Sequence, residues 1–132
     1  MHRKKILFIV LFINTLHQTP LHALPETCPT VEEIKNHRFH GWLPLYKSNE
    51  ELATSKDVVQ FKEHVTAFQS AQWNRAYLEN GHCFYQGTEN IVNTIIFAKD
   101  AWRPAETAHW SWVTPNIMAE CYSQQVTDCG FM

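Results

Sequence analysis

This sequence has little glycine, few basic residues and no long apolar run. It contains only 4 glycines and 6 prolines in 132 residues, a composition that excludes collagen-like and low-complexity chains. The strings that mark common enzymes are absent: there is no G-x-S-x-G, no H-E-x-x-H and no phosphate-binding loop. No C-x-x-C pair and no N-x-S/T glycosylation site occurs either. These absences indicate neither an enzyme nor a zinc-finger type of metal site.

The longest apolar segment, 6–16, is well short of the roughly 20 residues that span a bilayer. It follows the charged residues 2–5 and precedes the small-residue sequence 21–23. This order is typical of a secretory signal peptide. We therefore expect residues 1–23 to be removed after Ala23. Residues 24–132 would then form a single secreted or periplasmic domain without a stable membrane anchor.

Removal of residues 1–23 would change the charge of the chain. The 11 basic residues would fall to 8 with the loss of Arg3, Lys4 and Lys5, against 13 acidic residues, so the net charge would be −5. An acidic surface is poorly matched to nucleic acid and to anionic lipid headgroups. We expect no nucleic-acid partner.

Four cysteines, Cys28, Cys83, Cys121 and Cys129, all follow the expected leader. An even number in an exported domain predicts two disulfides, for which three pairings are possible. If Cys121 and Cys129 lay on one extended strand, they would be roughly 26 Å apart and could not bond to each other. This reasoning favours Cys83 with Cys121 and Cys28 with Cys129.

The local patterns predict both helices and strands. Thr30 and Glu33 form a capping box for a helix that ends near residues 40–41, and a second short helix is expected near 49–56. Residues 57–70 fit both helical and strand periods, and we expect extended chain from about 63.

Asn80-Gly81 predicts a two-residue turn between strands 73–79 and 82–86, with Leu78 opposite Cys83. Further strands are expected at 91–98, 110–113 and 119–126. The predicted fold class is α+β. An N-terminal helix would pack on an antiparallel β-meander of about four to five strands, held by two disulfides.

Three groups of polar residues could carry chemistry. A continuous helix would place Glu33, His37 and His40 on one side, where they could bind a metal ion. In each of the other two groups, a glutamate could orient a histidine as a general base. We favour ordinary surface pairing for all three, so we expect no catalytic residue, metal site or cofactor. The groups are Glu33 with His37 and His40, Glu106 with His109 beside Ser111, and Glu79 with His82.

Aromatic residues are abundant after residue 23, with five Trp, four Tyr and six Phe. Trp102, Trp110 and Trp112 flank Arg103 and Pro104, and a strand would place Trp110 and Trp112 on one face. These indole rings could fill the core or could form an exposed platform. We take the three tryptophans and Arg103 as the candidate ligand-binding surface.

This surface suggests a binding or interaction module whose partner is an extracytoplasmic protein or a glycan. Two alternatives remain: a small inhibitor of an extracytoplasmic hydrolase, and a small hydrolase that uses His109 or His82.

Several short motifs also occur in a characteristic order along the chain. Together they resemble a family of small secreted gammaproteobacterial proteins classed as a domain of unknown function, over nearly the whole of 24–132. That family often has proline where this chain has Gly130. The resemblance implies export and a disulfide-bonded fold, and it implies no catalytic residue. The motifs are Cys28-Pro29, Gly41-Trp42, Cys83-Phe84-Tyr85, Cys121 and the closing Cys129-Gly130-Phe131.

Overall fold

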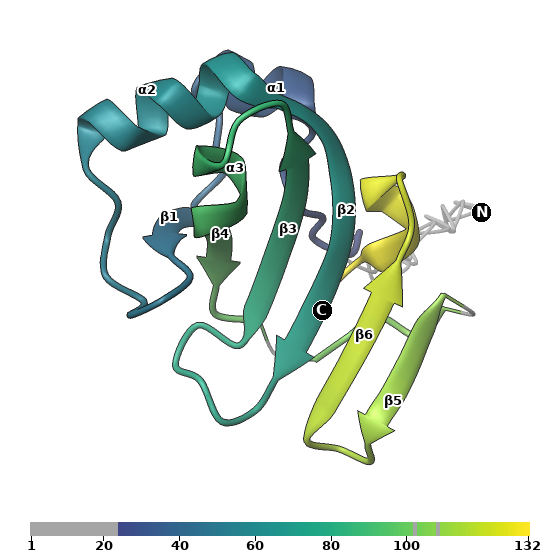
Figure 1. Ribbon diagram of the computed structural model, residues 1–132. Helices are drawn as coiled ribbons and strands as arrows, with labels where there is room; N and C mark the ends of the chain where they lie inside the picture. Colours follow the sequence, from purple (N-terminus) through teal and green to yellow (C-terminus); the bar gives the residue numbers. More distant parts are fainter. Residues whose placement is uncertain (1–23, 102, 108) are drawn as a thin grey trace, which may run out of the picture.

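The computed structural model describes residues 24–101, 103–107 and 109–132. Over these residues the chain forms one six-stranded antiparallel sheet with short helices (Figure 1). The helices are α1 (Val31–Lys35), α2 (Ser55–His64), α3 (Ile91–Thr94) and the 3-10 helix η1 (Val126–Cys129). The strands are β1 (Leu43–Tyr46), β2 (Val65–Asn74), β3 (Gly81–Gly87), β4 (Ile95–Lys99), β5 (Trp110–Thr114) and β6 (Met118–Tyr122).

The strand order is β1-β4-β3-β2-β6-β5, with antiparallel pairing between neighbours. The α+β class is therefore confirmed. The predicted meander of four to five strands is wrong in its detail, because the only run of three strands that are neighbours both in sequence and in space is β2, β3 and β4. The β5–β6 hairpin adds to the free side of β2, and β1 adds to β4 at the opposite edge.

Helix α1 begins as its capping box predicts. The Thr30 hydroxyl accepts a hydrogen bond from the Glu33 backbone N–H at 3.1 Å, and the Glu33 carboxylate accepts one from the Thr30 N–H at 3.4 Å. The helix is shorter than expected. It ends at Lys35, because the Asn36 side chain donates to the Glu32 carbonyl and His37 adopts a left-handed backbone conformation with φ of 56°.

The ambiguous segment around residue 60 contains both structures in succession. The Thr54 side chain caps α2 by accepting from the Asp57 N–H, and β2 begins directly after the helix at Val65. Segment 49–56 is therefore not the predicted helix. Its first residues form a turn in which the Asn49 side chain accepts from the Glu51 N–H at 3.0 Å.

The register of the β2–β3 pair also differs from the prediction. Cys83 pairs with Ala71 rather than with Leu78, which instead lies in the β2–β3 loop (75–80) and is 88% exposed. Asn80 does not form the tight turn because its side chain accepts from the Ala101 N–H at 2.7 Å. The loop is closed at its base by the Asn74 N–H, which donates to the Asn80 carbonyl at 2.9 Å.

The later strands are shorter than predicted or start later. Segment 91–98 begins with the single turn of α3 before β4, so it is not one continuous strand. The strand expected at 110–113 is present as β5. The strand expected at 119–126 ends at Tyr122, where the chain turns into η1.

Two disulfides form, as the sequence predicted, but the favoured pairing of the cysteines is wrong. Cys28 bonds Cys83, with the Cα atoms 5.8 Å apart, and Cys121 bonds Cys129 at 5.6 Å. The favoured pairing was wrong because Cys121 and Cys129 do not share a strand. The turn after β6 and the helix η1 bring Cys129 back beside Cys121 within eight residues.

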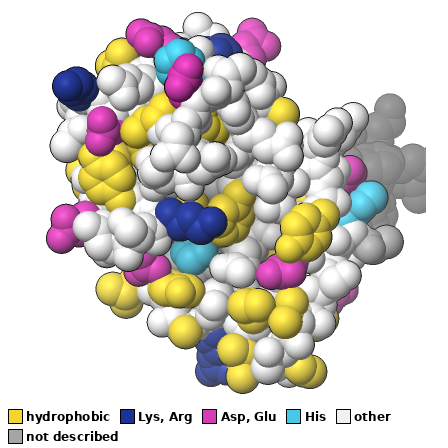
Figure 2. All heavy atoms as spheres, in the orientation of Figure 1, with side chains coloured by type: hydrophobic (Ala, Val, Ile, Leu, Met, Phe, Trp, Pro, Cys, Tyr) yellow, Lys and Arg dark blue, Asp and Glu magenta, His cyan; other side chains and the backbone are white. Residues whose placement is uncertain are grey.

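All the described helices pack on one face of the sheet. Each contributes a buried residue to the main core cluster: Ile34 from α1, Phe61 from α2, Val92 from α3 and Cys129 from η1. The opposite face, which we call the open face, carries a small apolar cluster to which none of these helices contributes. The open face is turned toward the viewer in Figures 1 and 2. None of the described helices is long and apolar enough to cross a membrane.

Candidate functional site

The expected tryptophan surface is only partly exposed. Trp110 and Trp112 line a groove of about 450 Å³ together with Arg103. Arg103 forms an ion pair with Glu106, with the charged atoms 3.7 Å apart. Trp102 lies outside the described residues. The alternation of β5 therefore places two of the three indole rings on the same groove.

Trp110 has a structural role in this groove. Its indole N–H donates to the Gly130 carbonyl at 2.9 Å, and its ring contacts Phe131 with the centroids 5.1 Å apart. The ring packs against the main core cluster. Trp112, in contrast, is 48% exposed and contacts Trp73 edge-on at 5.8 Å. Trp112 is thus the tryptophan of the pair that can meet a partner.

The group of Glu33, His37 and His40 does not converge. Because α1 ends at Lys35, His37 turns toward the Lys62 amino group at 3.3 Å, while His40 pairs with the Glu33 carboxylate. Among the described residues, no group of three or more His, Cys, Asp or Glu side chains is placed to hold a metal ion.

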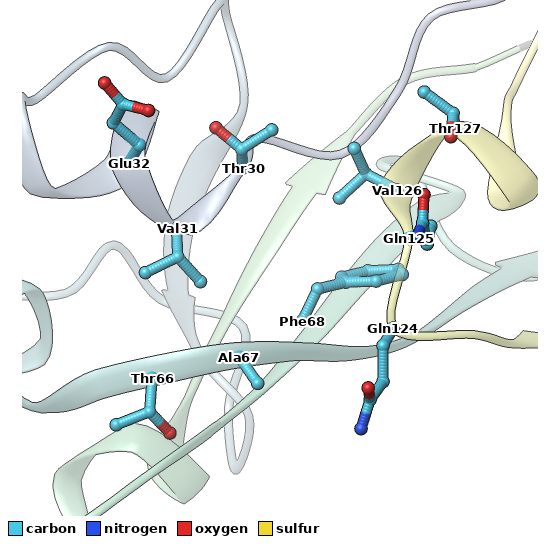
Figure 3. Close-up of a pocket in the computed structure, with 10 residues that line it drawn as sticks. All are labelled: Thr30, Val31, Glu32, Thr66, Ala67, Phe68, Gln124, Gln125, Val126 and Thr127. Carbon is cyan, nitrogen blue, oxygen red and sulfur yellow. The ribbon is translucent and has the colours of Figure 1, made fainter.

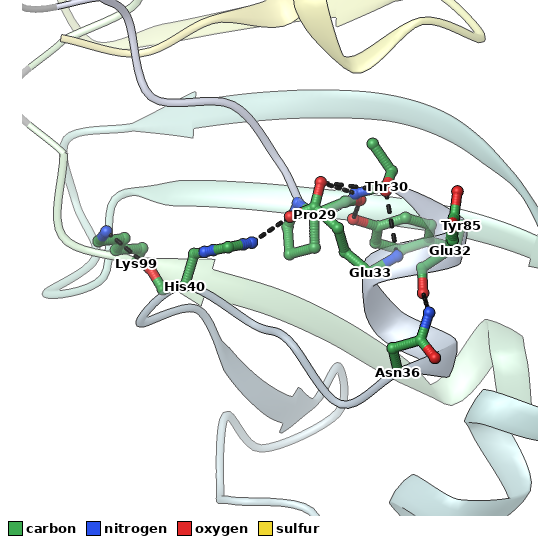
Figure 4. A network of polar contacts seen from close by, with 8 residues as sticks. All are labelled: Pro29, Thr30, Glu32, Glu33, Asn36, His40, Tyr85 and Lys99. Carbon is green, nitrogen blue, oxygen red and sulfur yellow. Dashed lines mark hydrogen bonds and ion pairs between the residues drawn. The ribbon is translucent and has the colours of Figure 1, made fainter.

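The Glu33–His40 pair belongs to a polar network at the start of α1 (Figure 4). Lys99 donates to the His40 carbonyl at 3.0 Å, and the buried Tyr85 hydroxyl donates to the Pro29 carbonyl. Burial raises the pKa of Tyr85, and the charge of Glu33 adds to the increase, so this phenol stays protonated. The network attaches the segment around α1 to strands β3 and β4.

The second pair, Glu106 with His109, does not form. His109 lies 3.5 Å from the Asp128 carboxylate instead, and Ser123 donates to the other oxygen of Asp128 at 2.7 Å. Asp128 therefore lies between Ser123 and His109. Nucleophilic catalysis requires the histidine to contact the hydroxyl, so this arrangement does not support the hydrolase alternative.

The third pair involves His82, which is buried on the open face. Its Nδ1 lies 3.5 Å from the Gln72 side-chain oxygen, and the Tyr77 ring contacts the imidazole at 5.1 Å. Burial lowers the pKa of His82, and the backbone and charge of Glu79 oppose the shift without reversing it. A buried neutral imidazole with an amide partner is a structural histidine.

We expect His82 to make the fold acid-sensitive. The folded state disfavours protonation of His82. The contribution of His82 to the free energy of unfolding is therefore complete above the unfolded pKa of about 6.5, and it is lost as the pH falls below that value. Urea unfolding should give a lower free energy of unfolding at pH 5.5 than at pH 7.5. The His82→Gln variant should show a smaller difference between the two pH values. The exposed His109→Gln variant should keep the wild-type difference. A His82→Gln protein with an unchanged difference would contradict this assignment.

A hollow with a volume of about 530 Å³ lies between α1, β2 and η1 (Figure 3). Phe68, which is buried, lies at its base between Val31 and Val126. Hydroxyl and amide side chains surround these apolar groups, and among the described lining residues only Glu32 is ionisable. The hollow offers hydrogen bonds and little acid–base chemistry.

Exposed apolar side chains gather at one end of the sheet, where the β2–β3 loop meets the β5–β6 turn (Figure 2). The two segments are joined by a hydrogen bond from the Arg75 N–H to the Ile117 carbonyl at 2.9 Å. We call this surface the apolar end. It consists of Tyr77, Leu78, Trp112, Val113 and Ile117, which are 40% to 88% exposed.

The sequence indicated only Trp112 of this group. Leu78 was assigned to a strand face, because the Asn80-Gly81 pair suggested a tighter turn than the one that forms. Comparison of this chain with family models, curated proteins and solved structures finds no match.

Proposed function

We propose that this chain is a binding module that holds a partner protein at the apolar end. One observation carries the proposal: five large apolar side chains are 40% to 88% exposed on two segments that a backbone hydrogen bond joins at one end of the sheet. A contiguous exposed apolar surface favours aggregation unless a partner covers it. Its aromatic members, Tyr77 and Trp112, are residue types that dominate the binding energy of protein interfaces.

The rigidity of this surface supports the same function. Trp112 rests against the buried Trp73, and the β2–β3 loop is closed by the hydrogen bond between Asn74 and Asn80. A surface that is already ordered loses little conformational entropy when it binds.

The two disulfides support a site of action in an oxidising compartment outside the cytoplasm. The leader-like residues 1–23 and the resemblance to secreted proteins agree with this location. The partner is then an extracytoplasmic protein.

The inhibitor alternative is favoured by one feature. Leu78 lies on a loop that is tied at its base and is the most exposed residue of the apolar end. A side chain presented in this way could enter the cleft of an extracytoplasmic hydrolase. In that case the partner is an enzyme whose activity falls when it binds.

The proposal is tested by affinity capture from an extract of the native organism. Leu78→Ser, Ile117→Ser and Trp112→Ala should each reduce the recovered partner, by roughly 30-fold for a residue worth about 2 kcal/mol. The urea midpoint should change little, because these side chains are exposed.

Leu52→Ser is the matched control, since Leu52 is 63% exposed on the segment before α2, outside the apolar end. It should bind normally. The proposal would be overturned if all four variants captured as much partner as the wild type does.

A further inference from the structure

The open face contains a recess between two aromatic side chains. Ser70 of β2 pairs with Tyr122 of β6 on one side and with Phe84 of β3 on the other. Neighbouring strands are about 4.8 Å apart, so the backbones of the two aromatic residues lie about 10 Å apart, with a small serine between them. The recess has a volume of about 210 Å³ and is also lined by Gln72, Glu120 and Lys47.

Planar hydrogen-bonding groups lie in the next row of the sheet. Gln72 pairs in register with Glu120 and with His82, so an amide and a carboxylate stand side by side at the recess. Among the described residues, the contacts of the Gln72 amide are long, 3.5 Å to His82 and 3.7 Å to the Met118 sulfur. Such contacts are weak, so the amide can turn to a ligand. The Glu120 carboxylate accepts from the Tyr122 hydroxyl at 3.1 Å, which leaves its other lone pairs available.

The two charges at the recess have opposite signs. The Lys47 amino group lies 5.5 Å from the centre of the Phe84 ring, and Glu120 supplies a negative charge on the side of Tyr122. One positive and one negative charge give no preference for an anion or a cation. The recess therefore suits a neutral ligand with many hydroxyl groups.

We infer that this recess binds one pyranose ring of a neutral saccharide. Tyr122 is 69% exposed and offers its ring to the apolar C–H face of the sugar. Gln72 and Glu120 can then bind adjacent hydroxyl groups through their planar side chains. The recess shares no residue with the apolar end, so this inference does not depend on the proposed function.

The experiment uses the oxidised protein and three trisaccharides as probes: maltotriose, cellotriose and triacetylchitotriose. Titration followed by ¹H–¹⁵N NMR should show saturable shifts for at least one probe, concentrated at Ser70, Gln72, Phe84 and Tyr122. Tyr122→Ala should weaken that binding at least tenfold. Tyr122→Phe should keep most of the affinity, because the stacking ring remains.

Trp112→Ala is the control, because it removes an exposed aromatic residue outside the recess; its saccharide affinity should be unchanged. Tyr122 is exposed on the sheet surface, so its replacement leaves the core intact and the variant can be measured. The inference is wrong if none of the probes gives saturable shifts at these residues up to about 10 mM. It is also wrong if Tyr122→Ala binds as tightly as the wild type.

Discussion

Replacement of Cys28 and Cys83 together by alanine should lower the free energy of unfolding by about 4 kcal/mol. The disulfide closes a loop with a sequence separation of 55, and in the chain-entropy model such a loop restricts the unfolded chain by about that amount. Its loss should also loosen the polar network of Figure 4, because Cys28 precedes the Pro29 carbonyl that accepts from Tyr85. Urea unfolding of the oxidised proteins measures the difference.

The second disulfide provides a matched control. Cys121 and Cys129 are as fully buried as the first pair but have a separation of only 8, which corresponds to about 2.5 kcal/mol. The two alanine pairs create similar cavities, so the difference between them reports loop length. If the Cys121/Cys129 variant lost as much stability as the Cys28/Cys83 variant, native packing rather than loop closure would be the main contribution.

Features that depend on a few neighbouring residues were predictable from the sequence. The capping box of Thr30 and Glu33 forms as expected, since both partners lie within one turn. Strand β5 also lies where the alternation of Trp110, Ser111 and Trp112 indicated. In each case the local pattern and the final fold require the same backbone conformation.

Features that depend on distant residues were not predictable. The pairing of Cys83 with Cys28 requires the position of the N-terminal segment. The pairing of Cys121 with Cys129 is local, and it was missed because segment 119–126 was predicted as one strand without the turn after Tyr122. The β2–β3 register, in contrast, depends on a distant residue. The Asn80 side chain is drawn to the Ala101 N–H at the end of β4, a contact that no local pattern reveals.

In the candidate site, too, the local features were predictable and those that depend on distant residues were not. Alternation along β5 correctly placed Trp110 and Trp112 on one groove, but the different exposure of the two rings depends on a distant segment. Residues 130–132 cross over Trp110, and the Gly130 carbonyl accepts its indole N–H. The polar row of Gln72, Glu120 and His82 was hidden because it requires the register of three strands.

The segment that covers Trp110 leads to the second large effect: Phe131→Ala should lower the free energy of unfolding by about 3 to 5 kcal/mol. Phe131 is fully buried, and its ring contacts Trp42 at 5.5 Å and Trp110 at 5.1 Å between centroids. Its backbone is tied to Glu26 by two hydrogen bonds of 2.7 and 2.8 Å. The lost ring would leave a cavity between two indole rings that the surrounding backbone cannot close.

Met132→Ala is the appropriate control, since Met132 follows directly, is 48% exposed and keeps its backbone hydrogen bonds to Arg103 in the variant. Its effect should be within about 0.5 kcal/mol. Urea unfolding of both variants, with hydrogen exchange at the amides of Glu26 and Phe131, separates two cases. If Phe131→Ala speeds exchange at these two amides but leaves the urea midpoint unchanged, residues 130–132 open independently of the sheet. In that case Phe131 does not belong to the cooperative core, because a core residue must lower the midpoint of the whole domain.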